Sequence, residues 1–400
     1  MVSPARLCLV CKGSRKLCGW RSCPLMAKMR VEPRIQKSLG TEFFGPSTSV
    51  FVGHNFYPNV YVGPMAAIER DAVELADSPR EWFGKPYDKI IEMRSMLLRS
   101  EARESVFSRS DFVGKVQELA LASKPTDVEM LFKKKPRYSF EFSDINQPMG
   151  PTASLEKLSI TENTKISEKV EKVVRDEVGA AQASGMLYDS GLDTHRIMTI
   201  MSSGALGLDK RRKMVPTRWS ITAIDDTLTK QMLERVRDYK QVTNFQVYES
   251  EYLDNHFVIL FIPGSWEFEN FEAWSPGSTW SFNLKKTEII EEYEPFGGRT
   301  TYADQEGGGY YASRFSVVEA LDRMKKQARV VVFREISEGY VVPLGVWVVR
   351  STAADAFKRR PKEFATKEEA LKYVSSRIRL PLDEYMKSSI VLRQRRIGDF

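Results

Sequence analysis

The stretch SVFVGHNFYPNVYVGPM, from Ser49 to Met65, carries a strong β-strand pattern. Valine, phenylalanine and tyrosine fill much of it, and β-branched and aromatic residues of this kind favour strands. Four turn-forming residues interrupt the pattern, namely Gly53, Pro58, Gly63 and Pro64. We therefore expect short strands joined by turns in this part of the chain.

Helices are expected on the carboxyl-terminal side of this stretch, because apolar residues recur there every three or four positions. One helix should follow Pro86, a second should follow Ser110, and a third should begin near Thr164. Their apolar stripes are Ile90, Met93 and Leu97; Val113, Val116 and Leu119; and Ile166, Val170, Val173 and Val174.

The rest of the chain mixes strand and helix patterns. The stretch RWSITAID predicts a strand, which leads into a helix capped at Thr227. Ser316 with Glu319 predicts a capping box for a short helix, and Thr366 with Glu369 predicts another. Further strands are expected at HFVILFI, STWSFN and ARVVVFREI, and the last of these should form a hairpin with YVVPLGVWVV.

These patterns predict an α+β fold, with a mixed or antiparallel sheet, helices and a small N-terminal module built on four cysteines. We expect this module in residues 1–30 and a lobe rich in strands and helices in residues 31–213. An α+β lobe should follow in residues 214–386, and residues 387–400 should form a terminal tail.

The composition is that of a chain with a full hydrophobic core and a basic surface. Of its 400 residues 42% are hydrophobic, and the net charge is +7. A basic balance suits an acidic partner such as nucleic acid, although lysine-rich surfaces also serve simply to keep a protein in solution. No apolar run approaches the roughly 18 residues of a membrane span, and the N-terminus lacks the apolar core of a secretory signal. We expect a cytoplasmic protein, free or associated with the nucleoid.

The four cysteines form one cluster, CLVCKGSRKLCGWRSC, with the pattern C-x2-C-x6-C-x4-C. Two such pairs of thiolates can complete a tetrahedron around Zn²⁺, and four protein ligands leave no open position for water. We therefore predict a structural zinc site. An iron site is an alternative, and so is a pair of disulfides, although a reducing cytoplasm disfavours the latter. The predicted ligands are Cys8, Cys11, Cys18 and Cys23.

The chain ends in QRRIGDF, where Gln394, Ile397 and Phe400 are spaced three residues apart. One helical turn would place Ile397 and Phe400 side by side as an apolar plug. The spacing resembles the peptide with which replication and repair proteins bind the sliding clamp PCNA, although the usual second aromatic residue is missing here. Neighbouring arginines could add long-range attraction to an acidic groove. The alternative is that this tail folds back on the protein's own core.

Several stretches together resemble the archaeal Nre family of DNA repair proteins. They are LCGWRSCP, SVFVGHNFYPNVYVGPM, KMVPTRWSITAIDD, PLGVWVVR and the terminal peptide, and the resemblance runs over essentially the whole chain. It implies a role in the repair of DNA damage and an interaction with PCNA. It assigns the zinc to the four cysteines, and the clamp contact to Gln394, Ile397 and Phe400.

Other residues suggest contact with phosphate. The basic run Lys210, Arg211, Arg212 and Lys213, with Arg218 close behind, could bind a nucleic-acid backbone, or it could be a solvated loop. Glycine-rich backbone ahead of a helix can hold phosphate, so a nucleotide pocket is a second candidate, with a flexible turn as its alternative. Its residues are Gly307, Gly308, Gly309, Ser313 and Arg314.

Two weaker patterns suggest catalysis. Asp225 and Asp226 could hold Mg²⁺ for phosphodiester chemistry, or simply begin a helix. His195 could act as a general base beside Asp193, or it could be a hydrogen-bonded structural residue. We expect a DNA repair protein that is recruited to PCNA, holds structural zinc and contacts nucleic acid. The alternative is a metal-dependent nuclease, or a nucleotide-binding or nucleotide-hydrolysing enzyme of DNA repair.

Overall fold

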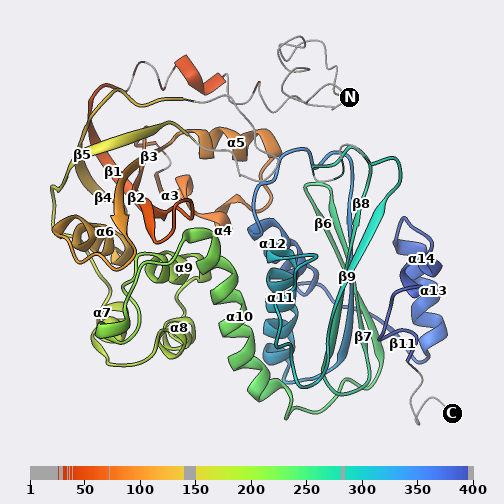
Figure 1. Ribbon diagram of the computed structural model, residues 1–400. Coiled ribbons are helices and arrows are strands. Elements are labelled where there is room, and N and C mark those ends of the chain that lie inside the picture. The colour runs from red at the N-terminus through yellow and green to blue at the C-terminus, as the bar shows by residue number, and fades with distance from the viewer. Residues whose placement is uncertain are drawn as a thin grey trace. The chain divides into compact units, whose positions relative to one another are not determined.

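The computed structural model describes residues 26, 30–33, 35, 37, 39–71, 73–138, 150–279, 281 and 284–394. The chain forms two compact units, Met1–Leu228 and Thr229–Phe400. Both combine a sheet with helices, so the α+β prediction is confirmed (Figure 1). The four cysteines of the predicted zinc module lie outside the described residues.

Five strands of the first unit close into a barrel in the order β1-β2-β3-β5-β4. Neighbouring strands are antiparallel except β3 and β5, which run parallel. One helix, α6 (Asp111–Leu121), connects β3 to β4. This strand order with this helix position is the topology of the OB-fold barrel. The strands are β1 (Glu42–Val52), β2 (Asn59–Ala67), β3 (Leu97–Ser105), β4 (Thr126–Phe132) and β5 (Thr152–Ile160).

The strands predicted between Ser49 and Met65 are confirmed as the antiparallel pair β1 and β2. Val50 faces Pro64 and Val52 faces Val62 in this pair, and both valines of β1 are buried. At Gly63 a Cβ atom would collide with the backbone of Ser100 on β3. Glycine is therefore required at this position of β2.

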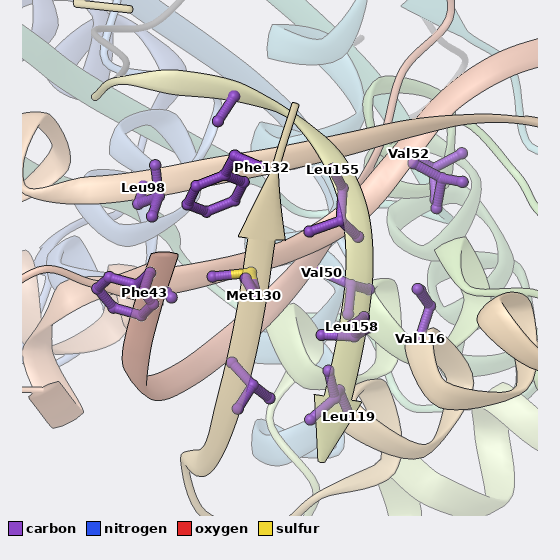
Figure 2. Packing of buried hydrophobic residues seen from close by; sticks show 14 of the residues in the cluster. Phe43, Val50, Val52, Leu98, Val116, Leu119, Met130, Phe132, Leu155 and Leu158 are labelled. Carbon is purple, nitrogen blue, oxygen red and sulfur yellow. The ribbon is translucent and has the colours of Figure 1, made fainter. Parts of the chain in front are cut away.

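The helix predicted after Ser110 is confirmed as α6, and its apolar stripe packs into the barrel core. Ser110 caps it by accepting a hydrogen bond from the amide of Val113. Figure 2 shows Val116 and Leu119 of this helix among the barrel's core side chains, near Leu158 of β5. Each side chain of this size contributes about 1.5–3 kcal/mol when fully buried, so the helix is part of the barrel's core rather than an addition to its surface.

Helical residues between Met26 and Lys37 precede the barrel, and further helices of the first unit lie in the β2–β3 connection and after the barrel. The predicted helix after Pro86 is confirmed, although Leu97 already begins β3, and the helix predicted near Thr164 is confirmed from Glu168. The elements are α3 (Val73–Ala76), α4 (Pro79–Trp82), α5 (Tyr87–Ser95), α7 (Glu168–Arg175), α8 (Ala180–Asp189), α9 (Thr194–Ser202) and the 3₁₀ turn η1 (Asp209–Arg211).

The prediction of a strand at RWSITAID is wrong, because this stretch lies inside helix α10 (Thr217–Val236). Ser220, Ile224 and Leu228 are buried at a spacing of four residues, which is a helical period. Thr227 is accordingly an interior residue and not a cap. The boundary between the two units falls within this helix.

The second unit is a six-stranded sheet in the order β11-β6-β7-β10-β8-β9, in which β8 and β10 are the parallel pair. Helices α11 (Gly308–Met324) and α12 (Trp347–Ala356) lie on one face, and α13 (Lys367–Arg377) and α14 (Leu382–Met386) on the other (Figure 1). The strands are β6 (Phe245–Tyr252), β7 (Asn255–Ile262), β8 (Glu267–Trp274), β9 (Glu288–Glu294), β10 (Arg329–Ile336) and β11 (Lys362–Phe364).

The structure confirms some of the strands and helix caps predicted from the sequence of this unit and contradicts others. The strands HFVILFI and ARVVVFREI are confirmed as β7 and β10, and the capping box of Thr366 and Glu369 begins α13. The capping box predicted at Ser316 is wrong, because Ser316 lies in the middle of α11 and its hydroxyl donates to the carbonyl of Arg350 at 2.9 Å. In STWSFN the described residues Ser278, Thr279 and Ser281 lie outside the strands, in a turn and its flank.

The predicted hairpin strand YVVPLGVWVV is also wrong. After β10 the chain turns, and helix α12 begins at Trp347. Gly345 has a φ of 106°, which ends any extended run, and the indole of Trp347 donates to the carbonyl of Leu344 at 2.7 Å. The β-branched residues that suggested a strand are instead buried in and around this helix.

Polar side chains line the sheet face beneath α11. Arg334 of β10 pairs with Glu272 of β8, and Arg314 of α11 pairs with Glu294 of β9. At Gly309 a Cβ atom would meet the Glu272 carboxylate, so a larger residue there would displace this carboxylate from its position beside Arg334. Each of these buried charges has an opposite charge beside it, which offsets the free energy of removing it from water.

Glu306 is the exception in this network. Its Oε2 atom accepts a hydrogen bond from Asn270, but its buried Oε1 atom has no hydrogen-bond partner among the described residues. Burial and the nearby charge of Glu272 raise the pKa of Glu306 well above the ordinary value of 4.5. The folded protein therefore favours the protonated form of this side chain.

We expect Glu306→Gln to remove a pH-dependent loss of stability. The folded state holds the Glu306 proton to a higher pH than the unfolded chain does, so wild-type stability falls as pH rises from about 4.5 toward the raised pKa. Each pH unit in that window costs about 1.4 kcal/mol. The free energy of unfolding should be measured with denaturant between pH 4 and pH 8. The variant should become increasingly more stable than wild type as the pH rises. Asp304→Asn, which removes an exposed carboxylate nearby, is the control, and parallel curves for Glu306→Gln and wild type would contradict the expectation.

Candidate nucleic-acid interface

Four aromatic side chains are exposed near one end of the barrel. Phe56 and Tyr57 lie in the β1–β2 connection, Phe107 follows β3, and Trp219 lies in the first turn of α10. Their exposed fractions are 67% for Phe56, 41% for Tyr57, 60% for Phe107 and 46% for Trp219. Large rings exposed as a group, rather than singly, are typical of a binding surface.

Backbone hydrogen bonds hold the three segments side by side. The amide of Val106 donates to the carbonyl of Pro58, and the amide of Met214 donates to the carbonyl of Val106, both at 2.8 Å. The hydroxyl of Thr217 accepts from the amide of Val52 at 3.0 Å. The rings of Tyr57 and Trp219 consequently meet, with their centroids 5.1 Å apart.

Phe56 itself has an unusual backbone conformation. Its φ of 65° lies in the left-handed region, which L-residues with a side chain rarely adopt. Such a conformation costs about 1–2 kcal/mol, and conformations of this kind concentrate at binding sites. The surrounding hydrogen bonds, including one from the amide of Asn59 to the carbonyl of Phe56 at 2.9 Å, hold the ring outward.

Cations accompany these rings. The guanidinium of Arg103 lies 5.7 Å from the centre of the Phe56 ring, and the ammonium of Lys213 lies 5.9 Å from that of Phe107. Three further exposed cations have no side-chain partner in the part of the chain that the structure describes: Lys210, Arg211 and Arg218. We name these five cations and the four aromatic residues the aromatic–basic surface.

Arg212, the remaining member of the predicted basic run, has a different role. Its side chain is half-buried and donates to the carbonyl oxygens of Gly207, at 2.7 Å, and Val174, at 2.5 Å. It therefore fixes the loop that carries its neighbours. Four of the five cations predicted from the sequence face solvent, and the fifth holds their backbone in place.

His195 contacts a different carboxylate from the one its sequence neighbourhood suggested. Asp193 caps α9 by accepting from the backbone amide of His195, whereas the imidazole Nε2 lies 3.4 Å from Asp77. Burial works against ionisation of Asp77, but His195 and Arg94 lower its pKa overall. Ser49 of β1 also donates to this carboxylate. The cluster joins α9 to the barrel, and this is a structural role.

The predicted catalytic carboxylates do not converge. Asp225 is fully buried in the middle of α10, and Asp226 beside it is half-buried. Adjacent helical residues point about 100° apart, so these two side chains cannot grip one ion from the same direction. Among the described residues, no group of three or more histidine, cysteine, aspartate or glutamate side chains could hold a metal ion.

Ser313 and Arg314 of the predicted nucleotide pocket are buried, whereas Gly307 and Gly308 are half-buried. Gly307 precedes α11 with a φ of 53°, and Gly308 is the first residue of the helix. Ser313 donates to the side-chain oxygen of Asn270 at 2.8 Å. Arg314 is 2% exposed and bonded to Glu294 at 2.8 Å. These side chains bind the sheet and are not free to bind phosphate in this conformation.

The terminal residues divide at Gln394. Val391 and Leu392 are buried in the core of the second unit, whereas Gln394 is exposed. Ile397 and Phe400, the other two residues of the predicted clamp-binding peptide, lie outside the described residues.

The aromatic residues were missed because their sequence context is apolar. Phe56, Tyr57 and Trp219 stand among valines, isoleucines and other aromatics, which suggested strands. The available signal was the asparagine and proline around Phe56 and Tyr57, since turn residues on both sides place a pair of rings at an exposed loop.

Comparison with known proteins identifies the family. Residues 17–281 match the family model described as archaeal Nre, N-terminal, and residues 294–400 match archaeal Nre, C-terminal. The six-stranded sheet takes strands from both matched regions. No solved structure matches the chain.

Named relatives cover nearly the whole chain. DNA repair protein NreB of Archaeoglobus fulgidus is 36% identical over 98% of this chain and 99% of its own length. DNA repair protein NreA of the same organism is 38% identical over 93% of both chains. DNA repair protein NreA of Haloferax volcanii is 34% identical over 86% of this chain and 85% of its own. On this similarity, the chain belongs to the archaeal Nre family.

Proposed function

We propose that this chain is a DNA repair protein that binds DNA through its aromatic–basic surface and is recruited to the sliding clamp PCNA by its last residues. The observation that carries the DNA contact is the group of Lys210, Arg211 and Arg218, three exposed cations without partners among the described side chains. The relatives that carry the name DNA repair protein support the same conclusion.

Free cations on a folded surface suit the DNA backbone. An ion pair already made within the protein has to be broken before a phosphate can bind, whereas an unpaired lysine or arginine can exchange its counterions directly. Arg109, which is paired with Asp209 at 3.4 Å, illustrates the first case. The net charge of +7 adds long-range attraction to any polyanion.

The clamp contact is supported by how the base of the tail is held. Arg329 of β10 donates to the carbonyl of Val391 at 2.8 Å, and Lys367 of α13 donates to that of Leu392 at 2.9 Å. The Glu269 carboxylate of β8 accepts from the amide of Val391 at 3.2 Å. The chain is therefore fixed up to Leu392 and reaches solvent at Gln394, where the proposed peptide begins.

The four cysteines are the proposed zinc ligands. Four thiolates in two closely spaced pairs match a closed tetrahedral site, which stabilises a small module and leaves no position for a substrate. This part of the proposal depends on spacing and donor type alone.

Neutralising the three free cations should weaken DNA binding and its salt dependence together. For the triple variant Lys210→Ala, Arg211→Ala, Arg218→Ala we expect the slope of log K against log salt to fall by about 3, since each lost phosphate contact removes about one counterion. The measurement is a titration of labelled DNA at several salt concentrations. The charge-matched control is Arg360→Ala, Lys362→Ala, Lys372→Ala in the second unit, and an equal effect of both triples would assign the result to net charge alone.

Removal of the plug should abolish clamp binding. For the double variant Ile397→Ala, Phe400→Ala we expect calorimetric titration into PCNA to show a loss of at least about a hundredfold, because the two apolar side chains contribute about 3–6 kcal/mol. Truncation after Gln394 should weaken PCNA binding to the same extent, and it leaves the buried residues Val391 and Leu392 in place. Asp399→Ala is the control within the tail. Undiminished binding by the double variant would place the clamp contact elsewhere or remove it.

Metal analysis tests the cysteine cluster. We expect one zinc per chain in the wild type and none in Cys8→Ser, with a lower melting temperature in the variant because the metal stabilises its module. Ser14→Ala, in the same loop, should keep its zinc. Iron in the wild type would support an iron site instead. A wild-type protein without free thiols and without metal would support a pair of disulfides.

A further inference from the structure

The barrel of the first unit has a topology that recurs in proteins that bind single strands of nucleic acid. In OB-fold barrels, oligonucleotides lie across the second and third strands and the connection between the first and second. In this chain that connection carries Phe56 and Tyr57, and β3 carries Arg103 beside them. Phe56 and Tyr57 thus lie where this barrel type holds its ligand.

The rings themselves indicate what they bind. A duplex hides the faces of its bases within the helical stack, so an exposed aromatic ring gains little from it. An unpaired base offers a free face, and stacking on an aromatic side chain is the usual source of affinity for single strands. Tyr57 and Trp219, with centroids 5.1 Å apart, form one platform, and Phe56 and Phe107 lie in the adjoining segments.

The charges around the rings suit a phosphate backbone between stacked bases. Lys213 and Arg103 lie within 6 Å of the rings of Phe107 and Phe56, so a base and its phosphate could be contacted together. In the same segments Asp209 pairs with Arg109, and Glu104 accepts from the hydroxyl of Ser110 and keeps its negative charge. The five cations of the aromatic–basic surface outnumber these two carboxylates, so the local net charge is positive.

The platform is also preformed. The hydrogen bonds that join Val106 to Pro58 and Met214, and Thr217 to Val52, fix the three segments before any ligand arrives. Less conformational entropy is then lost on binding, which raises the affinity that a small contact can reach.

We infer that the aromatic–basic surface is a binding site for single-stranded DNA, whose unpaired bases stack on Tyr57, Trp219 and the neighbouring phenylalanines. This inference rests on the proposed DNA-binding function and names its substrate, an unpaired strand in preference to a duplex. Lys210, Arg211 and Arg218 contact the backbone on either kind of DNA.

The test is a titration of the full-length protein with a labelled oligothymidylate and with a duplex of the same length. For Tyr57→Ala, Trp219→Ala we expect single-strand affinity to fall at least about 30-fold, as for the loss of two stacked bases, while duplex affinity stays within about twofold. Because stacking needs a ring and not a hydroxyl or an indole, Tyr57→Phe, Trp219→Phe should retain most of the single-strand affinity. Phe107→Ala provides a second, independent loss should the first variant fold poorly.

The outcomes separate the inference from the function on which it rests. Wild-type protein that binds duplex as tightly as the single strand, or a Tyr57→Ala, Trp219→Ala variant that loses both equally, would overturn the inference and leave DNA binding in place. Wild-type protein that binds neither would overturn both. Tighter binding of oligouridylate than of oligothymidylate would overturn the assignment to DNA.

Discussion

Closure of the five-stranded barrel is the constraint on which the candidate site depends. A closed sheet has no free edges, so each connection between strands leaves the barrel at a position fixed by the pairing on both sides. The pairing of β2 with β3 sets Asn59 opposite Ser105, and this brings the loop of Phe56 and Tyr57 beside Phe107. Gly63 makes that pairing possible, because any side chain there would strike the backbone of β3. The position of these exposed rings therefore depends on strand pairing inside the barrel.

The second unit is distinguished by buried polar and charged side chains on its sheet. Its sheet is covered on both faces, yet β8 brings Glu267, Asn270 and Glu272 inside. Buried charges of this kind add little net stability, since the free energy of desolvation nearly cancels their attraction. What they provide is a register: Glu272 satisfies Arg334 only when β8 lies beside β10 as observed, and the close approach of Gly309 depends on the same alignment. We interpret the network as a device that fixes how α11 meets the sheet, and the Oε1 atom of Glu306 has no hydrogen-bond partner among the described residues.

Sequence patterns predicted those features that depend on a few neighbouring residues. The helix after Ser110, the cap at Thr366 and the β1–β2 strands depend on local patterns, and these patterns predicted them. Barrel closure was not, because it depends on pairings between distant segments such as β1 and β4. A strand was wrongly predicted around Trp219 because the β-branched residues there favour strands. In the folded protein the stretch is part of helix α10, one side of which is buried. Arg212 shows the same limit within the site, since no local pattern distinguishes it from the free cations beside it.

The proposed contact with PCNA also explains why the proposed DNA site can be small. A few stacked rings and three free cations would bind DNA only weakly, and salt would weaken that binding further. A protein held on the clamp by its tail meets DNA at a high effective concentration, in the millimolar range for a short connection, so a weak site suffices for occupancy. Leu392 is anchored in the second unit, so only the residues that follow it separate this unit from the proposed clamp contact. Weak binding in isolation then has an advantage, because the protein releases DNA wherever no clamp is present.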